Sequence, residues 1–123
     1  YALEPDIGVA LDTTLAVDIP GTPAEQRVTR QGAGVALKVM DASMISTRWL
    51  LDEFVALAEK HGVPHQLELL PLGGTDAGAM QRSRKGVPSL TLSVPSRYVH
   101  TVTETVAKRD VEASLALLTH YLG

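Results

Sequence analysis

Short runs of β-forming residues alternate with helical segments along this chain, and that order restricts the possible folds more than any other feature. Four runs are rich in apolar and β-branched residues and are bounded by glycine, proline or polar turns. These expected strands are residues 7–17, 35–39, 65–71 and 89–94. Helical patterns cover residues 47–61, 76–82 and 110–121. Strands that alternate with helices of about 10–15 residues predict an α/β layer structure with a largely parallel or mixed sheet.

Residues 73–86 predict a glycine-rich loop that opens a short helix. The pair Gly73-Gly74 permits backbone conformations that other residues adopt only at a cost. Thr75 or Asp76 supplies a side-chain oxygen for the first free amides of the helix, and Gly86 ends it. A plain glycine turn with a capping residue explains this pattern as well as a ligand-binding loop does.

The strand expected at residues 89–94 leads directly into a polar cluster that ends at His100. We expect Pro95 to terminate the strand, which leaves the histidine close to its carboxyl end. In open α/β sheets, ligands bind just outside the carboxyl ends of strands. His100 is therefore a candidate metal ligand or acid/base, and a packed or solvent-facing imidazole is the alternative.

Asp12 interrupts the apolar pattern in the middle of the first expected strand. A carboxylate at a strand centre is costly to bury unless it is paired or bound to a cation. The alternative is a carboxylate that accepts backbone hydrogen bonds or faces water. Asp18 falls on the same face of a regular strand, because side chains alternate with a period of two. Periodicity alone does not choose between the two aspartates.

The two longer helices carry apolar stripes. In residues 47–61 the stripe is flanked by Trp49, which we expect to be a core anchor and not a substrate platform. We expect Asp110 to cap the last helix. The inward-facing residues expected on that helix are Val111, Leu115, Leu118 and Leu122.

The other three histidines are not expected to bind metal. His61 and His65 have the four-residue spacing of a helical metal pair, but Gly62 and Pro64 interrupt any helix between them. His120 lies in the last helical turn and is expected at the surface.

Composition limits the chain to one unit and few classes of site. Its 123 residues, about 45% of them hydrophobic, provide one core, and residues 1–123 are treated as a single unit. A net charge of −3 with mixed signs indicates no nucleic-acid partner and no membrane-binding face. Without cysteine, any metal site must use histidine and carboxylates. No apolar run approaches a membrane span and no targeting pattern is visible, so a cytoplasmic location is expected.

Four motifs, in order along the chain, resemble those of the tetrahedral metallo-aminopeptidases, also called glutamyl or deblocking aminopeptidases, some of which were labelled cellulases. The motifs are VALDTT at 9–14, DIPG at 18–21, GGTDAGA at 73–79 and SVPSRYVH at 93–100. The resemblance covers nearly the whole chain but only the family's C-terminal part. It implies part of a zinc-exopeptidase-like catalytic domain, a three-layer α/β sandwich, whose N-terminal portion lies upstream. The sequence begins at Tyr1 without an initiating methionine, so the chain is expected to be a processed product or a fragment, and the resemblance favours a fragment.

The resemblance also implies a site for two divalent ions, zinc or cobalt. By motif, Asp12 would bind one ion and His100 the other, whereas Asp18 would organise the loop that follows. Glu104 would orient the imidazole as an outer-shell partner or face solvent. Substrate contacts are expected from Gly74, Thr75, Asp76, Arg97 and Tyr98.

The expected function of the parent protein is removal of N-terminal residues from peptides, with a metal-activated water as nucleophile. The general-base glutamate, the bridging aspartate and a second histidine would lie upstream of Tyr1, so we expect this isolated chain to be inactive. The resemblance implies a homo-oligomer, a tetrahedral dodecamer. Two other classes stay open: a non-enzymatic α/β binding module, and a glycoside hydrolase that would pair Asp12 with Asp76.

Overall fold

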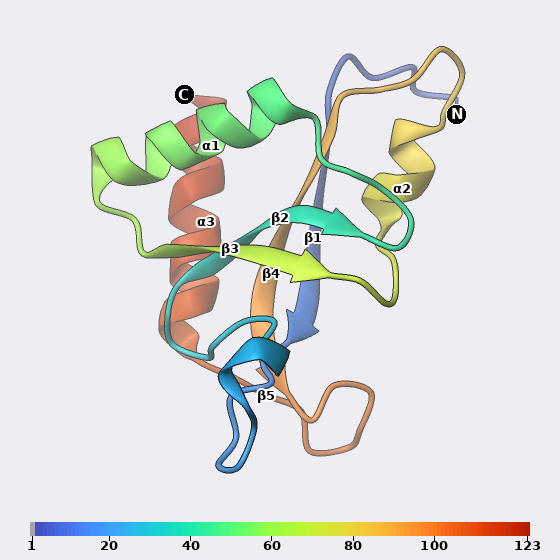
Figure 1. Cartoon of the computed structure of the whole chain (residues 1–123). Coiled ribbons are helices and arrows are strands. Elements are labelled where there is room, and N and C mark those ends of the chain that lie inside the picture. The colour runs from blue at the N-terminus through green and yellow to red at the C-terminus, as the bar shows by residue number, and fades with distance from the viewer. Residues whose placement is uncertain (1) are drawn as a thin grey trace.

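A computed structural model describes residues 2–123 of the chain. Every strand and helix expected from the sequence is present, together with a short 3-10 helix, η1, and a two-residue strand (Figure 1). In chain order the elements are β1 (Gly8–Leu15), η1 (Ala24–Gln26), β2 (Val35–Asp41), α1 (Arg48–His61), β3 (His65–Leu70), α2 (Asp76–Gln81), β4 (Ser89–Arg97), β5 (Thr105–Val106) and α3 (Lys108–Leu122).

The strands form one mixed sheet in the order β1-β4-β2-β3, and β5 pairs with β4. β1 runs parallel to β4 and β2 runs parallel to β3, whereas β2 is antiparallel to β4. The expected α/β fold is thus confirmed, with the sheet mixed. In the β1–β4 pair, Asp12 lies opposite Ser93. Because the two strands are parallel, the segments that follow them leave the sheet at the same edge.

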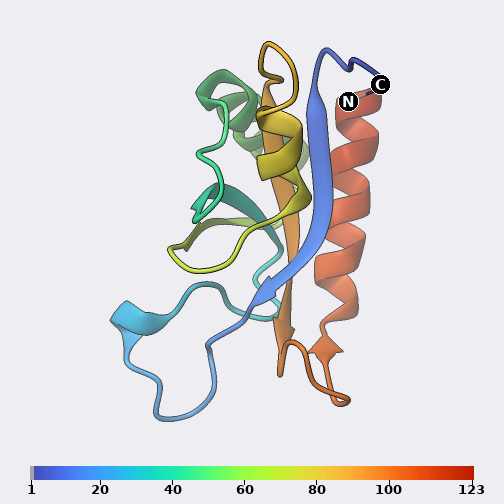
Figure 2. The same ribbon diagram turned by 90° about the vertical axis from the view of Figure 1, so that its right-hand side faces the viewer.

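Helices cover both faces of the sheet, which makes the expected three layers. α1 and α3 pack on one face over the larger core, around Leu37, Phe54 and Leu92. α2 packs on the other face, where Ala77 meets Ala10 of β1 (Figure 2). Val9 of β1 packs against the larger core and the next residue, Ala10, faces α2, because successive side chains of a strand point to opposite faces of the sheet.

Pro95 does not end its strand, contrary to the sequence-based expectation. β4 continues to Arg97, and Pro95 lies opposite Thr14. The amide of Ala16 donates to the carbonyl of Ser96 over 2.9 Å, so Ser96 directs its backbone groups toward β1. Backbone groups alternate sides along a strand, and the nitrogen of Pro95 therefore points away from β1. Its missing N–H removes no hydrogen bond from the β1–β4 pair.

The inner face of α3 matches the stripe expected from the sequence only at Leu118, which packs against the core. Val111, Leu115 and Leu122 are exposed, and Ala113 and Leu117 are buried instead. The helix also begins before Asp110, with Ala107 at the N-cap position. Asp110 itself is buried, and its carboxylate accepts hydrogen bonds from the amides of residues 32 and 34 over 2.6 and 2.8 Å. It thus fastens a distant loop to the helix and caps nothing.

Trp49 is not a core anchor, because 51% of its surface is exposed. It lies in the first turn of α1, whose buried residues are Leu50, Leu51, Phe54 and Ala58. The stripe expected on this helix is otherwise correct. None of the helices within residues 2–123 has the length and apolar character needed to cross a membrane.

Candidate metal and substrate site

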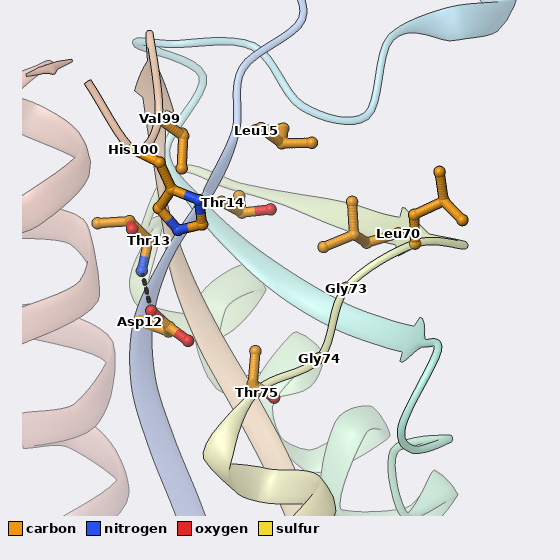
Figure 3. A pocket seen from close by; sticks show the side chains of 11 residues that line it. Asp12, Thr13, Thr14, Leu15, Leu70, Gly73, Gly74, Thr75, Val99 and His100 are labelled. Atoms are coloured by element: carbon orange, nitrogen blue, oxygen red, sulfur yellow. Dashed lines mark hydrogen bonds between the residues drawn. The ribbon is translucent and has the colours of Figure 1, made fainter.

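A pocket of about 260 Å³ lies at the sheet edge where β1 and β4 end (Figure 3). The carboxylate of Asp12 and the imidazole of His100 both face it, so two residues separated by most of the chain meet at one place. Its lining residues are Asp12, Thr13, Thr14, Leu15, Leu70, Leu72, Gly73, Gly74, Thr75, Val99 and His100.

Asp12 is exposed to the pocket, so the expected cost of burying a carboxylate at a strand centre does not arise. One carboxylate oxygen, Oδ1, accepts the amide of Thr13 over 2.8 Å. The other has no hydrogen-bond partner among residues 2–123. A fixed carboxylate with one free oxygen has the chemistry of a ligand for a divalent cation.

His100 is held in place by its backbone. Tyr98 and His100 adopt positive φ angles of 59° and 64°, which non-glycine residues rarely do. The turn is stabilised by the amide of Thr101, which donates to the carbonyl of Tyr98 over 3.1 Å. The carboxylate of Glu104 accepts the backbone amide of His100. Glu104 therefore fixes the turn through the backbone. The outer-shell interpretation required a hydrogen bond from Glu104 to the imidazole, and the structure does not show one among residues 2–123.

Glycines at 74 and 78 allow α2 to approach the loop that follows β2. A Cβ atom at Gly78 would lie 2.2 Å from Oγ of Ser43, and one at Gly74 would lie 2.9 Å from the same atom. Neither glycine has a positive φ, so close packing, not turn geometry, explains both. Ser43 thus occupies the space where a side chain at residue 74 or 78 would lie, and residues 73–75 form a wall of the pocket.

Thr75 joins that wall to Asp41 at the end of β2. Its hydroxyl donates to Oδ2 of Asp41 over 3.1 Å and contacts the hydroxyl of Thr91 at 2.9 Å. Burial by itself raises the pKa of Asp41, but hydrogen bonds from Ser43, Thr75 and Met44 outweigh it and leave the pKa below its ordinary value. The Asp41 carboxylate therefore stays ionised and keeps the wall in place.

Asp18 organises the loop after β1, as the sequence indicated. The guanidinium of Arg97 donates to it over 2.7 and 3.1 Å, and the amide of Gln31 donates over 2.9 Å. The hydrogen bond from Arg97 is the main reason that the pKa of Asp18 is lowered. Among the residues that the structure describes, Arg97, Tyr98 and Asp76 do not line the pocket, whereas Gly74 and Thr75 do.

A buried polar network beside the pocket was not foreseen from the sequence. Lys38 and Glu68 are fully buried on neighbouring strands, with Nζ and Oε1 2.5 Å apart, and the hydroxyl of Thr14 donates to the same carboxylate oxygen. A lysine and a glutamate inside strand patterns were the only signal for it. Oε2 of Glu68 has no partner within residues 2–123.

The other histidines lie elsewhere. His61 and His120 stack at the ends of α1 and α3, with ring centroids 3.8 Å apart, and Nδ1 of His65 is 3.1 Å from the carbonyl of Val63. None of the three lines the pocket in the described part of the chain.

The Asp12 carboxylate and the His100 imidazole are suitable ligand types for zinc or cobalt, but two ligands are fewer than a catalytic site needs. Carboxylate and imidazole are ordinary ligands for both ions. Residues 2–123 hold no cluster of three or more histidine, aspartate or glutamate side chains suited to a metal ion. Since catalytic zinc usually has three protein ligands, Asp12 and His100 are too few to form such a site by themselves.

The fold superposes on part of known aminopeptidase structures. An aminopeptidase from the archaeon Desulfurococcus kamchatkensis superposes with a TM-score of 0.96 at 34% identity, over 98% of this chain and 35% of that chain. The TET1 peptidase of Pyrococcus horikoshii, described as assembling into a tetrahedron or a large octahedral shell, gives a TM-score of 0.73 at 30% identity, over 93% of this chain and 32% of that one.

The sequence is similar to known aminopeptidases and matches one family. A putative aminopeptidase of Acetivibrio thermocellus is 38% identical over 96% of this chain and 35% of its own length. The family model for M42 glutamyl aminopeptidases matches residues 1–117, and the chain belongs to this family. It spans about a third of the length of the relatives that it matches.

Proposed function

We propose that the protein to which this chain belongs is a metal-dependent aminopeptidase that removes N-terminal residues from peptides. The observation that supports this most directly is the convergence of Asp12 and His100 on one pocket in a chain of the M42 family. Asp12 would hold one divalent ion and His100 a second, both zinc or cobalt. When bound, such ions polarise a peptide carbonyl and lower the pKa of water.

The chain's own residues would position the substrate. The pocket is open beside Asp12, and the Gly73–Thr75 wall, braced by Asp41, limits the space available to the first side chain of a peptide. Three further residues are still predicted to contact the substrate, although they do not line the Asp12–His100 pocket: Asp76, Arg97 and Tyr98. A free amine near the ions would distinguish a chain end from an internal bond.

A peptidase assay tests the proposal. The full-length protein should cleave peptides with a free amino terminus, and N-acetylated versions of the same peptides should resist. Chelation should abolish the cleavage, and added zinc or cobalt should restore it. Equal hydrolysis of free and acetylated peptides would contradict the exopeptidase assignment.

We also propose that the full-length protein is a homo-oligomer, a tetrahedral dodecamer, in the cytoplasm. The support is the structural similarity to the Pyrococcus horikoshii peptidase, whose assembly is tetrahedral or octahedral. Sedimentation of the full-length protein would give a mass about twelve times that of one subunit, and a monomeric mass would contradict the proposal.

A further inference from the structure

A second cleft, of about 290 Å³, lies between the loop that follows β1 and the beginning of α3. Three arginines from separate parts of the chain line it: Arg27 next to η1, Arg30 in the loop before β2, and Arg109 in the first turn of α3. It shares no lining residue with the Asp12–His100 pocket.

The carboxylates at this cleft are already hydrogen-bonded to groups other than its three arginines. Buried Asp110, next to Arg109, accepts the amides of Gly32 and Gly34. The one carboxylate in the lining, Asp18, already receives two hydrogen bonds from Arg97. Within residues 2–123 the side chains of Arg30 and Arg109 form no hydrogen bond or ion pair. Among the described residues, the Arg27 side chain donates only to the carbonyl of Thr22, at 3.4 Å. The three arginines repel one another, and this repulsion costs free energy. They lie together even though the net charge of the chain is −3.

The backbone that carries Arg30 and Arg109 is fixed in position. The side-chain amide of Gln66 makes two hydrogen bonds to the backbone of Arg30. Its oxygen accepts the Arg30 N–H over 2.9 Å, and its nitrogen donates to the Arg30 carbonyl over 3.0 Å. Buried Asp110 bonds the same loop to α3 through the amides of Gly32 and Gly34. A fixed arrangement lowers the conformational cost of binding a ligand.

Arg109 is placed directly over the loop. A Cβ atom on Gly32 would lie 2.2 Å from Nη2 of Arg109, and Gly32 has a φ of +83°. The absence of a side chain at Gly32 therefore leaves room for the guanidinium beside the cleft. The position of the Arg109 guanidinium therefore depends on the absence of a side chain at Gly32.

We propose that this cleft binds the phosphoryl group of a small molecule. A guanidinium matches two oxygens of an oxyanion at once, and a doubly charged group offsets the excess charge of the cleft better than a single carboxylate does. The proposal involves no metal and does not depend on the peptidase assignment.

Titration of the chain with phenyl phosphate and with inorganic phosphate, at constant ionic strength, tests it. Amide signals of residues 31–34 and 109 in the NMR spectrum should shift and saturate with both probes, and acetate should bind about 10-fold more weakly. Arg30→Gln and Arg109→Gln should each weaken phosphate binding about 10-fold. The control Arg48→Gln makes the same charge change on α1, where Arg48 pairs with Asp52, and should leave binding unchanged.

Circular dichroism would check that each variant is folded. Gly32→Ala should displace the Arg109 guanidinium and weaken binding in the same direction as Arg109→Gln. Lack of saturation with either phosphate, equal binding of acetate, binding of inorganic phosphate but not of the ester, or an equal loss in Arg48→Gln would each overturn the proposal.

Discussion

The hydroxyl of Thr14 donates to the carboxylate of Glu68, although 54 residues separate them in the chain. Thr14 lines the candidate pocket on β1, and Glu68 lies fully buried on β3 beside the equally buried Lys38 of β2. Three strands are thereby connected next to the pocket through one carboxylate oxygen. Removing two charges from water is costly, so this ion pair is not explained by stability alone.

The Lys38–Glu68 pair predicts a strongly asymmetric response to mutation. Lys38→Met should destabilise the fold by about 3–5 kcal/mol, because it leaves the buried Glu68 carboxylate without its cation. Lys38→Met combined with Glu68→Gln should recover most of that loss, since the amide oxygen still accepts from Thr14. Urea unfolding of both variants measures the difference. If the double variant is as unstable as the single one, the uncompensated charge is not the cause.

Asp12 and His100 should be required for metal binding by the full-length protein. Asp12→Ala and His100→Ala should each reduce metal affinity and activity by more than the roughly 10–100-fold typical of a lost outer-shell partner. His61→Ala and His120→Ala are the controls, because their rings stack away from the pocket. Metal analysis of the four purified variants decides the assignment. Loss of metal in His61→Ala with retention in His100→Ala would reverse it.

Gly78 should not tolerate a methyl group. Gly78→Ala places Cβ 2.2 Å from Oγ of Ser43 and should cost about 1–3 kcal/mol through overpacking. Ser43→Gly in the same molecule should restore part of the loss by removing the clashing side chain. Gly21→Ala is an unsuitable control because its φ is +89°. Ala79→Gly, at an exposed residue of the same helix, measures the roughly 1 kcal/mol difference in helix propensity between alanine and glycine without a clash. Thermal unfolding compares the variants, and additive single effects at 43 and 78 would contradict direct contact.

Much of the fold was predictable because its signals are local. Strand and helix positions follow from apolar periodicity and from glycine and proline, and these placed every main element. The prediction that Pro95 ends its strand was wrong. A proline can continue a strand when its nitrogen points away from the paired neighbour, and the sequence does not show which side of β4 pairs with β1. The α3 stripe was misjudged as well, since helical periodicity identifies an apolar face and does not say what covers it.

The candidate site was predictable only in part. Asp12 and His100 were identified by motif, and the parallel β1–β4 pair brings them to one pocket. The role of Asp110 was not visible, because its partners are backbone amides of a loop that is distant in sequence. Contacts of this kind depend on tertiary structure and leave no local pattern.

The lowered pKa values of Asp18 and Asp41 predict a loss of stability in acid. Their ordinary value is 3.8, and both are lower in the folded chain. A carboxyl group of this kind stabilises the fold above its unfolded pKa and loses that contribution as the pH falls through its folded pKa. The free energy of unfolding should therefore begin to fall below about pH 4.

Replacement of one carboxylate isolates its share of this pH dependence. Asp41→Asn should lower stability at pH 7, because the amide replaces the ionised acceptor of Thr75 and Ser43, and should make the acid-side decline shallower. Asp6→Asn, at an exposed position, serves as the control. Urea unfolding between pH 7 and pH 2.5 measures both effects. An unchanged slope in Asp41→Asn would show that other groups cause the decline.

The outer edge of β1 should bind another chain when the 123 residues are studied alone. Within residues 2–123, β1 pairs only with β4, and the amides of Gly8 and Ala16 point toward β4, so the odd-numbered amides between them point outward. The amide of Thr13 donates to the Asp12 carboxylate, which leaves the amides of residues 9, 11 and 15 for pairing. Leu11 on this edge is 60% exposed. An edge with free backbone groups and apolar side chains tends to pair with a second strand.

Leu11→Lys should prevent that association, because a charged side chain discourages strand pairing at an edge. Val102→Lys introduces the same charge at an exposed loop residue and should leave association intact. Sedimentation of the isolated chain should show self-association, or a complex when the rest of the polypeptide is supplied, and metal titration should show weak binding because only Asp12 and His100 are present. A stable monomer that binds two metal ions tightly would mean that the edge is closed and that the chain contains ligands beyond these two.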